Sequence, residues 1–378
     1  MKFLRLAFYV LIAQLVLSGC AGEGVEETSS SSASEINFDA YVGRNASTRS
    51  NITDIDFLRS GEWNAGFGVF ARYNHIDGTI SSLMDTEHVT WRENHWGYDH
   101  IRFWPSNGNV DFYAFAPYSP QVTMGKLPDY LADKLVDKTH SKDETYIDFP
   151  SNMSPVDLVW NKQLGKTAPI SPADSRKVKF QFKHALVRLG FDITANQELE
   201  EKGAVITVKE VKLYGAEENK GIFLMAGYLN LKTGDWVPYN NNFSWFYTWT
   251  KDGKVDGKDE DQEQQKKDGP IYKLSAPPLL DHTHKIITND VKDSYIFIIP
   301  QDLPANFNLK ITYTVEQGKF KEDVTVYKNL LDVLPKDPFG VGGKAYIFHF
   351  KLSLDPINFK VTTDVVNWNE VKNETMPL

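Results

Sequence analysis

The sequence predicts an all-β protein built from packed β-sandwiches. Aromatic residues make up 13% of the 378 residues, and they fall in short alternating runs separated by Gly, Pro, Asn and Asp. That composition is typical of strands and turns. Helical periodicity is scarce along the chain. Strands of this kind bury one face each, so two sheets must pack together to form a core.

The amino terminus has the pattern of a bacterial lipoprotein signal. Lys2 and Arg5 precede an apolar run from Leu6 to Leu17. A run of about a dozen residues is too short to span a bilayer, which needs roughly 20, but it suits a secretory signal peptide. The motif Leu17-Ser18-Gly19-Cys20 then matches the lipobox, in which the Cys thiol receives the lipid. We predict a signal peptide over 1–19 and lipidation at Cys20, with an ordinary signal peptide as the alternative.

Cys20 is the only cysteine, so no intramolecular disulfide can form and lipidation explains the thiol. Residues 20–35 are rich in Ser and Gly and include Glu23, Glu26 and Glu27, which predicts a flexible tether. The acidic cluster resembles the surface-export signal of lipoproteins in some Gram-negative anaerobes. The expected location is therefore the cell surface, on the outer membrane, with membrane lipid as a partner through Cys20.

Alternating apolar runs predict the strands of the mature chain. They are Ile36–Val42, Gly66–Tyr73, Val110–Ala116, Val178–Phe182, Ala204–Tyr214, Ile222–Leu231, Ser294–Ile299, Phe307–Val315, Val324–Tyr327, Lys344–Leu352 and Phe359–Val366. The best helix candidates are the short charged stretches 129–138 and 195–202.

The length of the mature chain predicts two domains, because about 340 residues exceed one ordinary core. Residues 165–174 combine two prolines with small and polar residues. We place the junction there, giving an N-terminal sandwich over 36–174 and a C-terminal sandwich over 175–378.

An ordered series of short motifs resembles the fimbrillin family. The motifs are Ile36-Asn37-Phe38, Thr48-Arg49, Gly68-Val69-Phe70-Ala71, Arg102-Phe103-Trp104-Pro105, Val110–Pro117, Asp157-Leu158-Val159-Trp160, Phe182-Lys183-His184-Ala185-Leu186, Tyr346-Ile347-Phe348 and Val365-Val366-Asn367-Trp368. They cover nearly the whole mature chain in the family's order.

The resemblance implies two transthyretin-like β-sandwiches in tandem and a role as a subunit of surface fimbriae, used for adhesion and biofilm formation. In such pilins an arginine-specific protease removes an amino-terminal strand, and a strand from the next subunit replaces it. Here the removable strand is Ile36–Val42 and the candidate cuts follow Arg49 or Arg44. Phe359–Val366 is alternating enough to be a donated strand or a fixed one. The subunit position, whether stalk, tip or anchor, stays open.

Other functions find little support in the sequence. No Gly-x-Ser-x-Gly elbow, His-Glu-x-x-His or phosphate-binding glycine loop occurs, so we expect no enzyme and no cofactor. The acidic segment 251–269 is expected to be a solvated loop. It hints at a calcium-binding loop, but Lys254 places a cation at the third ligand position, where it would repel the ion. The net charge of −9 argues against nucleic acid as a partner.

The second function considered is a monomeric glycan-binding surface lipoprotein that recognises a host or bacterial ligand. The aromatic cluster of Trp245 and Trp249 beside Asn240 is its best candidate contact, because aromatic faces stack on sugars. Core packing is the commoner use of such residues. His282 and His284 could share a strand face, but two ligands alone do not make a metal site.

Overall fold

The computed structural model confirms the all-β class, whereas the transthyretin-like tandem stays a prediction. The structure describes residues 34–42, 53–135, 138–149, 156–169, 177–195, 201–217, 221–224, 226–239, 244–245, 247–250, 279–280, 296–303, 305–334, 339–353 and 360–367. Within them strands dominate, and the helical elements α1 (Ile55–Leu58), α2 (Asp129–Ala132) and the 3-10 turn η2 (Leu330–Val333) are single turns. The helix predicted over 129–138 is therefore only one turn long.

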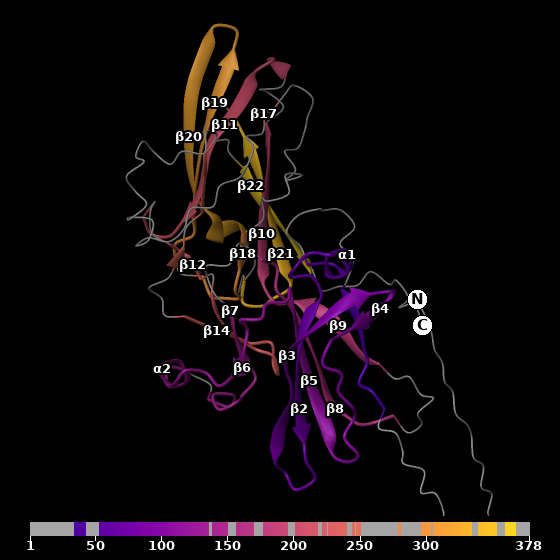
Figure 1. The fold of residues 1–378 in the computed structure, drawn as a ribbon. Helices are drawn as coiled ribbons and strands as arrows, with labels where there is room; N and C mark the ends of the chain where they lie inside the picture. The colour runs from indigo at the N-terminus through magenta and orange to yellow at the C-terminus, as the bar shows by residue number, and fades with distance from the viewer. Residues whose placement is uncertain are drawn as a thin grey trace, which may run out of the picture. The chain divides into compact units, whose positions relative to one another are not determined.

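The largest sheet has seven strands, all from the first half of the chain, and β2, β3, β5, β8 and β9 are labelled in Figure 1. In sheet order its strands are β1 (Phe38–Val42), β9 (Val178–His184), β8 (Val159–Lys166), β5 (Asn109–Ala116), β2 (Phe67–Asn74), β3 (Ile80–Arg92) and β4 (His95–Gly97). All neighbours are antiparallel except β1 and β9, which run parallel. A parallel pair cannot be a hairpin, so β1 reaches β9 across most of the first half of the chain.

The seven-stranded sheet curls around one apolar core. Strands β1 and β4, at opposite ends of the sheet, contact each other. Phe67 and Val69 of β2, Phe112 of β5 and Phe180 of β9 all belong to the enclosed cluster. These side chains recur at every second position, as expected for strands that bury one face.

The opposite face of the same sheet packs on a second, smaller sheet. That sheet consists of β14 (Trp236–Pro238), β13 (Gly227–Asn230), β7 (Tyr146–Phe149) and β6 (Met124–Gly125). Phe70 and Phe115 stack at 5.8 Å between ring centroids and lie with Ile147 and Leu229 in the cluster between the two sheets. The first part of the fold is therefore a sandwich with apolar clusters on both faces of its main sheet.

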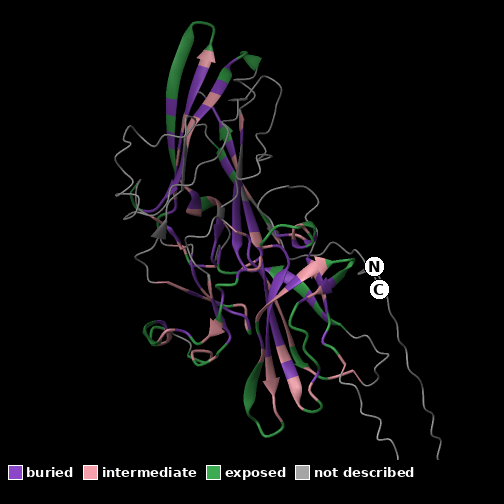
Figure 2. Ribbon diagram, in the orientation of Figure 1, coloured by how far each residue is buried: buried purple, intermediate pink, exposed green. Residues whose placement is uncertain are grey.

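A second sandwich follows. One sheet contains, in order, β18 (Ile296–Ile298), β10 (Val187–Ala195), β21 (Lys344–Leu352) and β22 (Lys360–Asn367). The other contains β16 (Tyr247–Thr250), β11 (Val205–Tyr214), β19 (Asn308–Gln317) and β20 (Phe320–Asn329). The short strand β17 (Leu279–Leu280) also pairs with β11. Phe348 and Phe350 from the first sheet meet Ile311 and Tyr313 from the second in one buried cluster. Figure 2 shows this buried interior along the facing strands.

The two sandwiches share residues near β9, β10 and β18. Adjacent residues Phe297 and Ile298 lie in different cores, Phe297 in the cluster between the first two sheets and Ile298 in the second sandwich. Strand β9 follows the predicted junction at residue 174 but pairs with β8 and β1 in the first sheet. The junction itself stays a prediction. The chain enters the second sandwich after β9 and returns to the first for β13 and β14, which lie in one sheet with β7.

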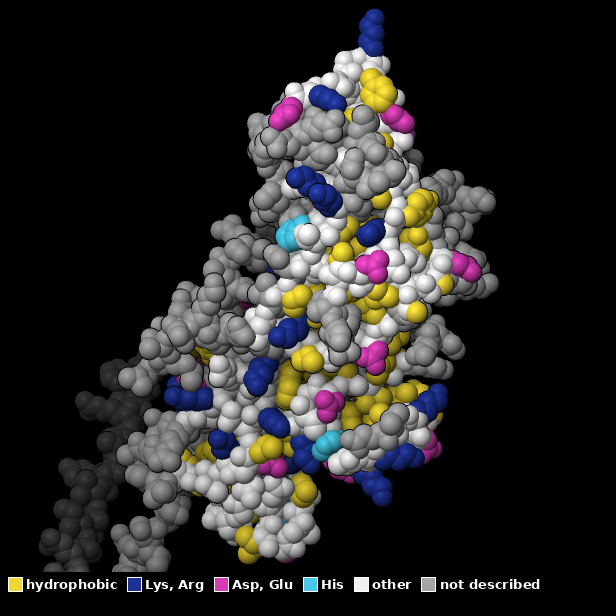
Figure 3. All heavy atoms as spheres, turned by 180° about the vertical axis from the view of Figure 1, so that it is seen from behind, with side chains coloured by type: hydrophobic (Ala, Val, Ile, Leu, Met, Phe, Trp, Pro, Cys, Tyr) yellow, Lys and Arg dark blue, Asp and Glu magenta, His cyan; other side chains and the backbone are white. Residues whose placement is uncertain are grey.

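A two-stranded pairing of β12 (Phe223–Leu224) with β15 (Ser244–Trp245) completes the described sheets. In the described part of the chain no helix has the length and apolarity needed to cross a membrane. Acidic and basic side chains are interspersed on the face seen in Figure 3 rather than gathered by sign. That distribution offers no basic stripe for a phosphate backbone on this face.

Candidate functional site

Strand β1 is held on both of its edges. On one edge its residues pair in parallel with β9, from Phe38 opposite Val178 to Val42 opposite Phe182. On the other edge, just before the strand, the Ile36 N–H donates to the Arg102 carbonyl at 2.9 Å and the Trp104 N–H donates to the Ser34 carbonyl at 2.9 Å. We call this position, between β9 and residues 102–104, the β1 slot.

Side chains from β1 fill the core beneath the β1 slot. Alternate residues Ile36, Phe38, Ala40 and Val42 point inward and are buried, with Val42 at 0% exposure. The intervening Asp39 and Tyr41 are half-buried, which gives the alternation of a strand with one face inward. Strand β1 and the residues just before it therefore supply four inward side chains to the core.

Phe38 is the centre of an aromatic cluster in the β1 slot. Its ring lies 5.9 Å from Phe180 in a stacked arrangement, and 6.0 and 6.4 Å from Phe112 and Phe67 in edge-on arrangements. Tyr98 lies 5.4 Å away and its hydroxyl donates to the Ile36 carbonyl at 2.8 Å. Burial raises the pKa of Tyr98 above its ordinary value, so the hydroxyl stays a donor at neutral pH.

The chain is anchored again shortly after β1. The Thr53 N–H donates to the Asp157 carboxylate at 2.8 Å, and the Thr53 hydroxyl donates to the Asp157 carbonyl at 2.5 Å. His184 Nδ1 lies 3.0 Å from the same carboxylate, and the His184 and Asp157 side chains are 3% and 0% exposed. His184 thus contributes to a buried anchor rather than to an open site. We call Thr53, Asp157 and His184 the Thr53 anchor.

The predicted processing and lipidation residues lie between or before these fixed points. Cys20, Arg44 and Arg49 all fall outside the described residues. Arg59, a further arginine at the end of α1, is exposed and its guanidinium lies 4.2 Å from the Trp91 ring centroid. That contact occupies the Arg59 side chain on the protein surface.

An open polar groove lies on the first sandwich, away from the β1 slot. It has a volume of about 1040 Å³. Its lining includes Arg72, Asp111 and Tyr113 from the main sheet, and Lys126, Asp143 and Glu144 from the segment around α2. The Arg72 guanidinium pairs with Asp85 at 2.7 Å, and Lys126 pairs with Glu144 at 3.0 Å. Two cations of the lining, Arg72 and Lys126, are therefore each paired with a carboxylate.

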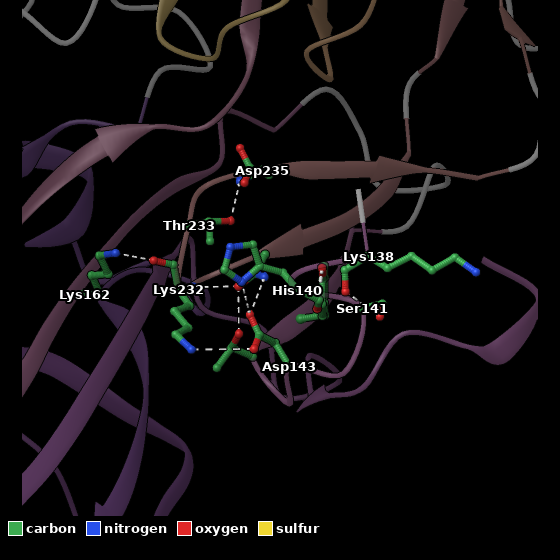
Figure 4. Close-up of polar contacts among 11 residues, drawn as sticks. Lys138, His140, Ser141, Asp143, Lys162, Lys232, Thr233 and Asp235 are labelled. Atoms are coloured by element: carbon green, nitrogen blue, oxygen red, sulfur yellow. Dashed lines mark hydrogen bonds and ion pairs between the residues drawn. The ribbon is translucent and has the colours of Figure 1, made fainter. Parts of the chain in front are cut away.

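Asp143 organises one wall of this groove (Figure 4). Its carboxylate lies 2.8 Å from His140 Nδ1 and 3.6 Å from the Lys232 ammonium, and it accepts from the Asn230 amide at 3.3 Å. Asn230 is fully buried and accepts in turn from the Thr145 hydroxyl at 2.7 Å. The network joins the turn after β13 to the segment that leads into β7, so it supports the fold.

Titration behaviour in the groove follows burial. Burial raises the pKa of Tyr113 to about 12, with the Asp111 and Asp143 carboxylates acting in the same direction. Among the described residues, no group of three His, Cys, Asp or Glu side chains is placed to hold a metal ion. The paired polar side chains of the groove are therefore described only by their hydrogen bonds and ion pairs within the protein.

The candidate glycan residues lie on separate short strands. Trp245 belongs to β15 opposite Phe223, whereas Trp249 belongs to β16 opposite Val211 of a different sheet. His282, His284 and the segment 251–269 lie outside the described residues. Two further tryptophans, Trp96 and Trp104, are buried in the core around β1, so they serve packing.

Sequence patterns identified β1 as a strand but missed what holds it. Residues 102–104 belong to one of the family motifs, but nothing in the sequence around them indicates that they form the second edge of the β1 slot. The same holds for the Thr53 anchor, whose partners are 104 positions apart.

The fold and the β1 slot define a class: two-sandwich β proteins in which an amino-terminal strand completes the main sheet. The family described as fimbrillin-like matches residues 48–368, and the chain belongs to that family.

The chain is also similar to individual proteins in sequence or in fold. The chain is 27% identical over 195 residues to the fimbrium subunit Fim1C of Phocaeicola vulgatus, and the alignment covers 48% of each protein, so it spans about half the length of that relative. A fimbrial protein from Bacteroides vulgatus has a similar fold, with a TM-score of 0.52 and 16% identity over 88% of this chain and 99% of that one. A cell adhesion protein described for Bacteroides uniformis gives a TM-score of 0.45 and 16% identity over 88% of this chain and 99% of that one.

Proposed function

We propose that this chain is a structural subunit of a cell-surface fimbria, as stalk, tip or anchor, assembled by protease-triggered strand exchange and contributing to adhesion and biofilm formation. Membership of the fimbrillin-like family supports the fimbrial role. The observation that supports the mechanism is the position of β1. This strand lies near the amino terminus of the chain, pairs with β9 and places its inward side chains in the core.

Removal of β1 would leave a gap that favours refilling. The inward side chains Ile36, Phe38 and Val42 are at most 1% exposed, so their loss opens an apolar groove beneath the sheet. The backbone of β9 would also lose its parallel partner and become an open edge. An open edge above an apolar groove binds an added strand through main-chain hydrogen bonds and side-chain pockets.

The placement of the candidate cuts fits this mechanism. Arg44 and Arg49 lie between two fixed points, Val42 in the β1 slot and Thr53 in the Thr53 anchor. A cut after Arg49 separates β1 from the rest of the chain while Thr53 stays bound to Asp157. The remaining subunit therefore keeps its core and loses only the strand.

The same cut would make the lipid on Cys20 a temporary anchor that delivers the precursor to the outer membrane. The signal peptide 1–19, the lipidated Cys20, the tether and β1 all precede Arg49 in the sequence. The precursor would be held on the outer membrane by its lipid, and cleavage would release it with an empty β1 slot. Before the cut the lipid is the partner; afterwards the partners are other subunits.

The test is direct. The purified chain is incubated with an arginine-specific protease and analysed by gel electrophoresis without boiling, with Arg49→Lys and Arg44→Lys as matched variants. We expect a ladder of oligomers for the wild type and its loss in the variant that removes the cut. Complete cleavage at these arginines without any ladder would overturn the strand-exchange proposal.

A further inference from the structure

The hydroxyl of Tyr113 has no partner within the protein and opens into the polar groove of the first sandwich. Tyr113 is only 4% exposed, and its ring packs in the cluster between the main sheet and the smaller one. The residue also lines the groove, and no described residue forms a hydrogen bond with its hydroxyl. Buried polar groups are normally hydrogen-bonded, so this hydroxyl is available to a ligand in the groove.

The charges that act on Tyr113 place its hydroxyl at the groove. Burial raises the pKa of Tyr113, and the charges of Asp111, Asp143 and Arg72 also act on it. All three of these residues line the groove. Because the interaction between charges falls with distance, the hydroxyl lies close to the charged walls. It keeps its proton at neutral pH and is therefore an uncharged donor at the base of the groove.

The groove lies on the face of the main sheet that also packs on the smaller sheet. On β2, Phe70 packs between the two sheets, whereas Arg72, two positions further on the same face, lines the groove. On the neighbouring strand β5, Phe115 packs between the sheets and Asp111, on the same face, lines the groove. The face therefore changes from apolar to polar along both strands, and the polar part forms the base of the groove.

The main chain at the base of the groove is already paired. Strand β2 lies between β3 and β5, and β5 lies between β2 and β8. An extended peptide binds a sheet by adding to an open strand edge, and neither β2 nor β5 has one. A ligand on this face must therefore be recognised by side chains, which favours a ligand with many hydroxyl groups over a peptide.

The side chains of the groove offer both donors and acceptors. The described lining carries five basic and five acidic side chains, so the groove does not favour a strongly charged ligand of either sign. Lys142, Asp129 and Asp133 are exposed, and no described residue pairs with their charged groups. An ammonium group donates and a carboxylate accepts. Ile80 and Leu164, which are 66% and 40% exposed, add apolar contacts to the lining.

We propose that the polar groove binds an uncharged oligosaccharide, with one sugar hydroxyl bonded to Tyr113 and others bonded to Lys142, Asp129 and Asp133. A sugar hydroxyl both donates and accepts, so it matches a lining of uncharged, basic and acidic groups. The C–H faces of the sugar rings suit the apolar contacts. The volume of about 1040 Å³ leaves room for several sugar units.

This inference rests on the adhesive part of the proposed function and names the class of its ligand. It does not depend on strand exchange, because the groove is complete while β1 is in place. The groove also contains neither Trp245 nor Trp249, the other candidate glycan contacts. Sugar binding can therefore be measured on the uncleaved chain, separately from assembly.

A glycan array tests the ligand class. The uncleaved chain is applied to neutral oligosaccharides, to sialylated and sulfated glycans and to peptides, and we expect binding to neutral oligosaccharides. Tyr113→Phe removes the hydroxyl but keeps the ring, and it should weaken the affinity for the best neutral oligosaccharide about fivefold, the value of one hydrogen bond. Calorimetric titration measures this change. Tyr327→Phe, at an exposed tyrosine of β20, is the matched control and should leave the affinity unchanged.

A second pair of variants leaves the core untouched. Lys142 is exposed and lines the groove, whereas Lys134 is exposed in the same segment but does not belong to the lining. Lys142→Gln should weaken sugar binding about threefold through the lost charged donor. Lys134→Gln removes the same charge nearby and should leave binding unchanged.

The outcomes separate this inference from the proposed assembly. Binding to no neutral oligosaccharide, or only to sialylated and sulfated glycans or to peptides, contradicts it. Equal affinity of Tyr113→Phe and the wild type also contradicts it, and loss of binding in Trp245→Ala with Trp249→Ala would then assign the sugar to that pair. The oligomer ladder of the cleaved chain is independent of all these results and tests strand exchange alone.

Discussion

Phe38 contributes more packing to the core around β1 than its strand neighbours, since aromatic rings of four other residues surround it. Phe38→Ala is expected to destabilise the uncleaved chain by about 3–5 kcal/mol, through lost burial and the cavity left behind. Denaturant unfolding measures this loss. Phe320→Ala, at a residue that is 45% exposed, is the control and should change stability by less than about 1 kcal/mol.

Tyr113 links stability to alkaline pH. Its pKa is about 12 in the folded chain against an ordinary value of 10.0, so the folded chain holds this proton more tightly than the unfolded chain. The resulting stability is present below pH 10 and decreases as the pH rises from 10 toward 12. Tyr113→Phe should flatten this decrease in unfolding curves recorded across that range. An unchanged slope would assign the alkaline loss to other groups.

Among the elements, α1 depends on the Thr53 anchor. Asp157→Ala leaves the Thr53 N–H and His184 without their carboxylate partner in a buried site, at a cost of about 3–5 kcal/mol. Hydrogen exchange should rise over Thr53–Leu58 in this variant, and after cleavage the new amino terminus should fray. Asp129→Ala, in the single turn α2, serves as the control and should leave exchange at α1 unchanged.

Elements with regular alternation were predictable and irregular ones were not. The runs at 110–116, 204–214 and 344–352 correspond closely to β5, β11 and β21, because each buries one face. Strand β3 was missed because it is rich in polar residues and only Met84 and Val89 within it are buried. Its register against β2 also shifts twice, and Thr86 within it has φ of 52°. Such bulges break the period of two that marks a strand.

Long-range partners had no signal in the sequence. The alternation of β1 predicted a strand but not its parallel neighbour β9, since pairing depends on the whole topology. The same limit applied to β9, which follows the proline-rich segment and was therefore assigned to the second domain. Local composition predicts where a strand lies and leaves its sheet undetermined.

At the scale of the whole molecule, β18 couples the two sandwiches. Phe297→Ala should lower hydrogen-exchange protection in β13, whose Leu229 shares its core, while Ile298→Ala should lower protection in β11. Each substitution removes packing from one core only. Loss of protection in both strands from either substitution would instead show that the two cores unfold as a single cooperative unit.

The parallel pairing of β1 with β9 also sets an order of events during synthesis. Phe38 and its partner Val178 are separated by 140 positions (178 − 38). While a ribosome or a translocase delivers the chain from its amino terminus, β1 emerges first yet has no partner until β9 follows. Contacts of such long sequence separation form late, because the loop between them must close first. The other strands of this sheet lie between β1 and β9 in the chain, so β1 is expected to complete the sheet only after β9 has been delivered.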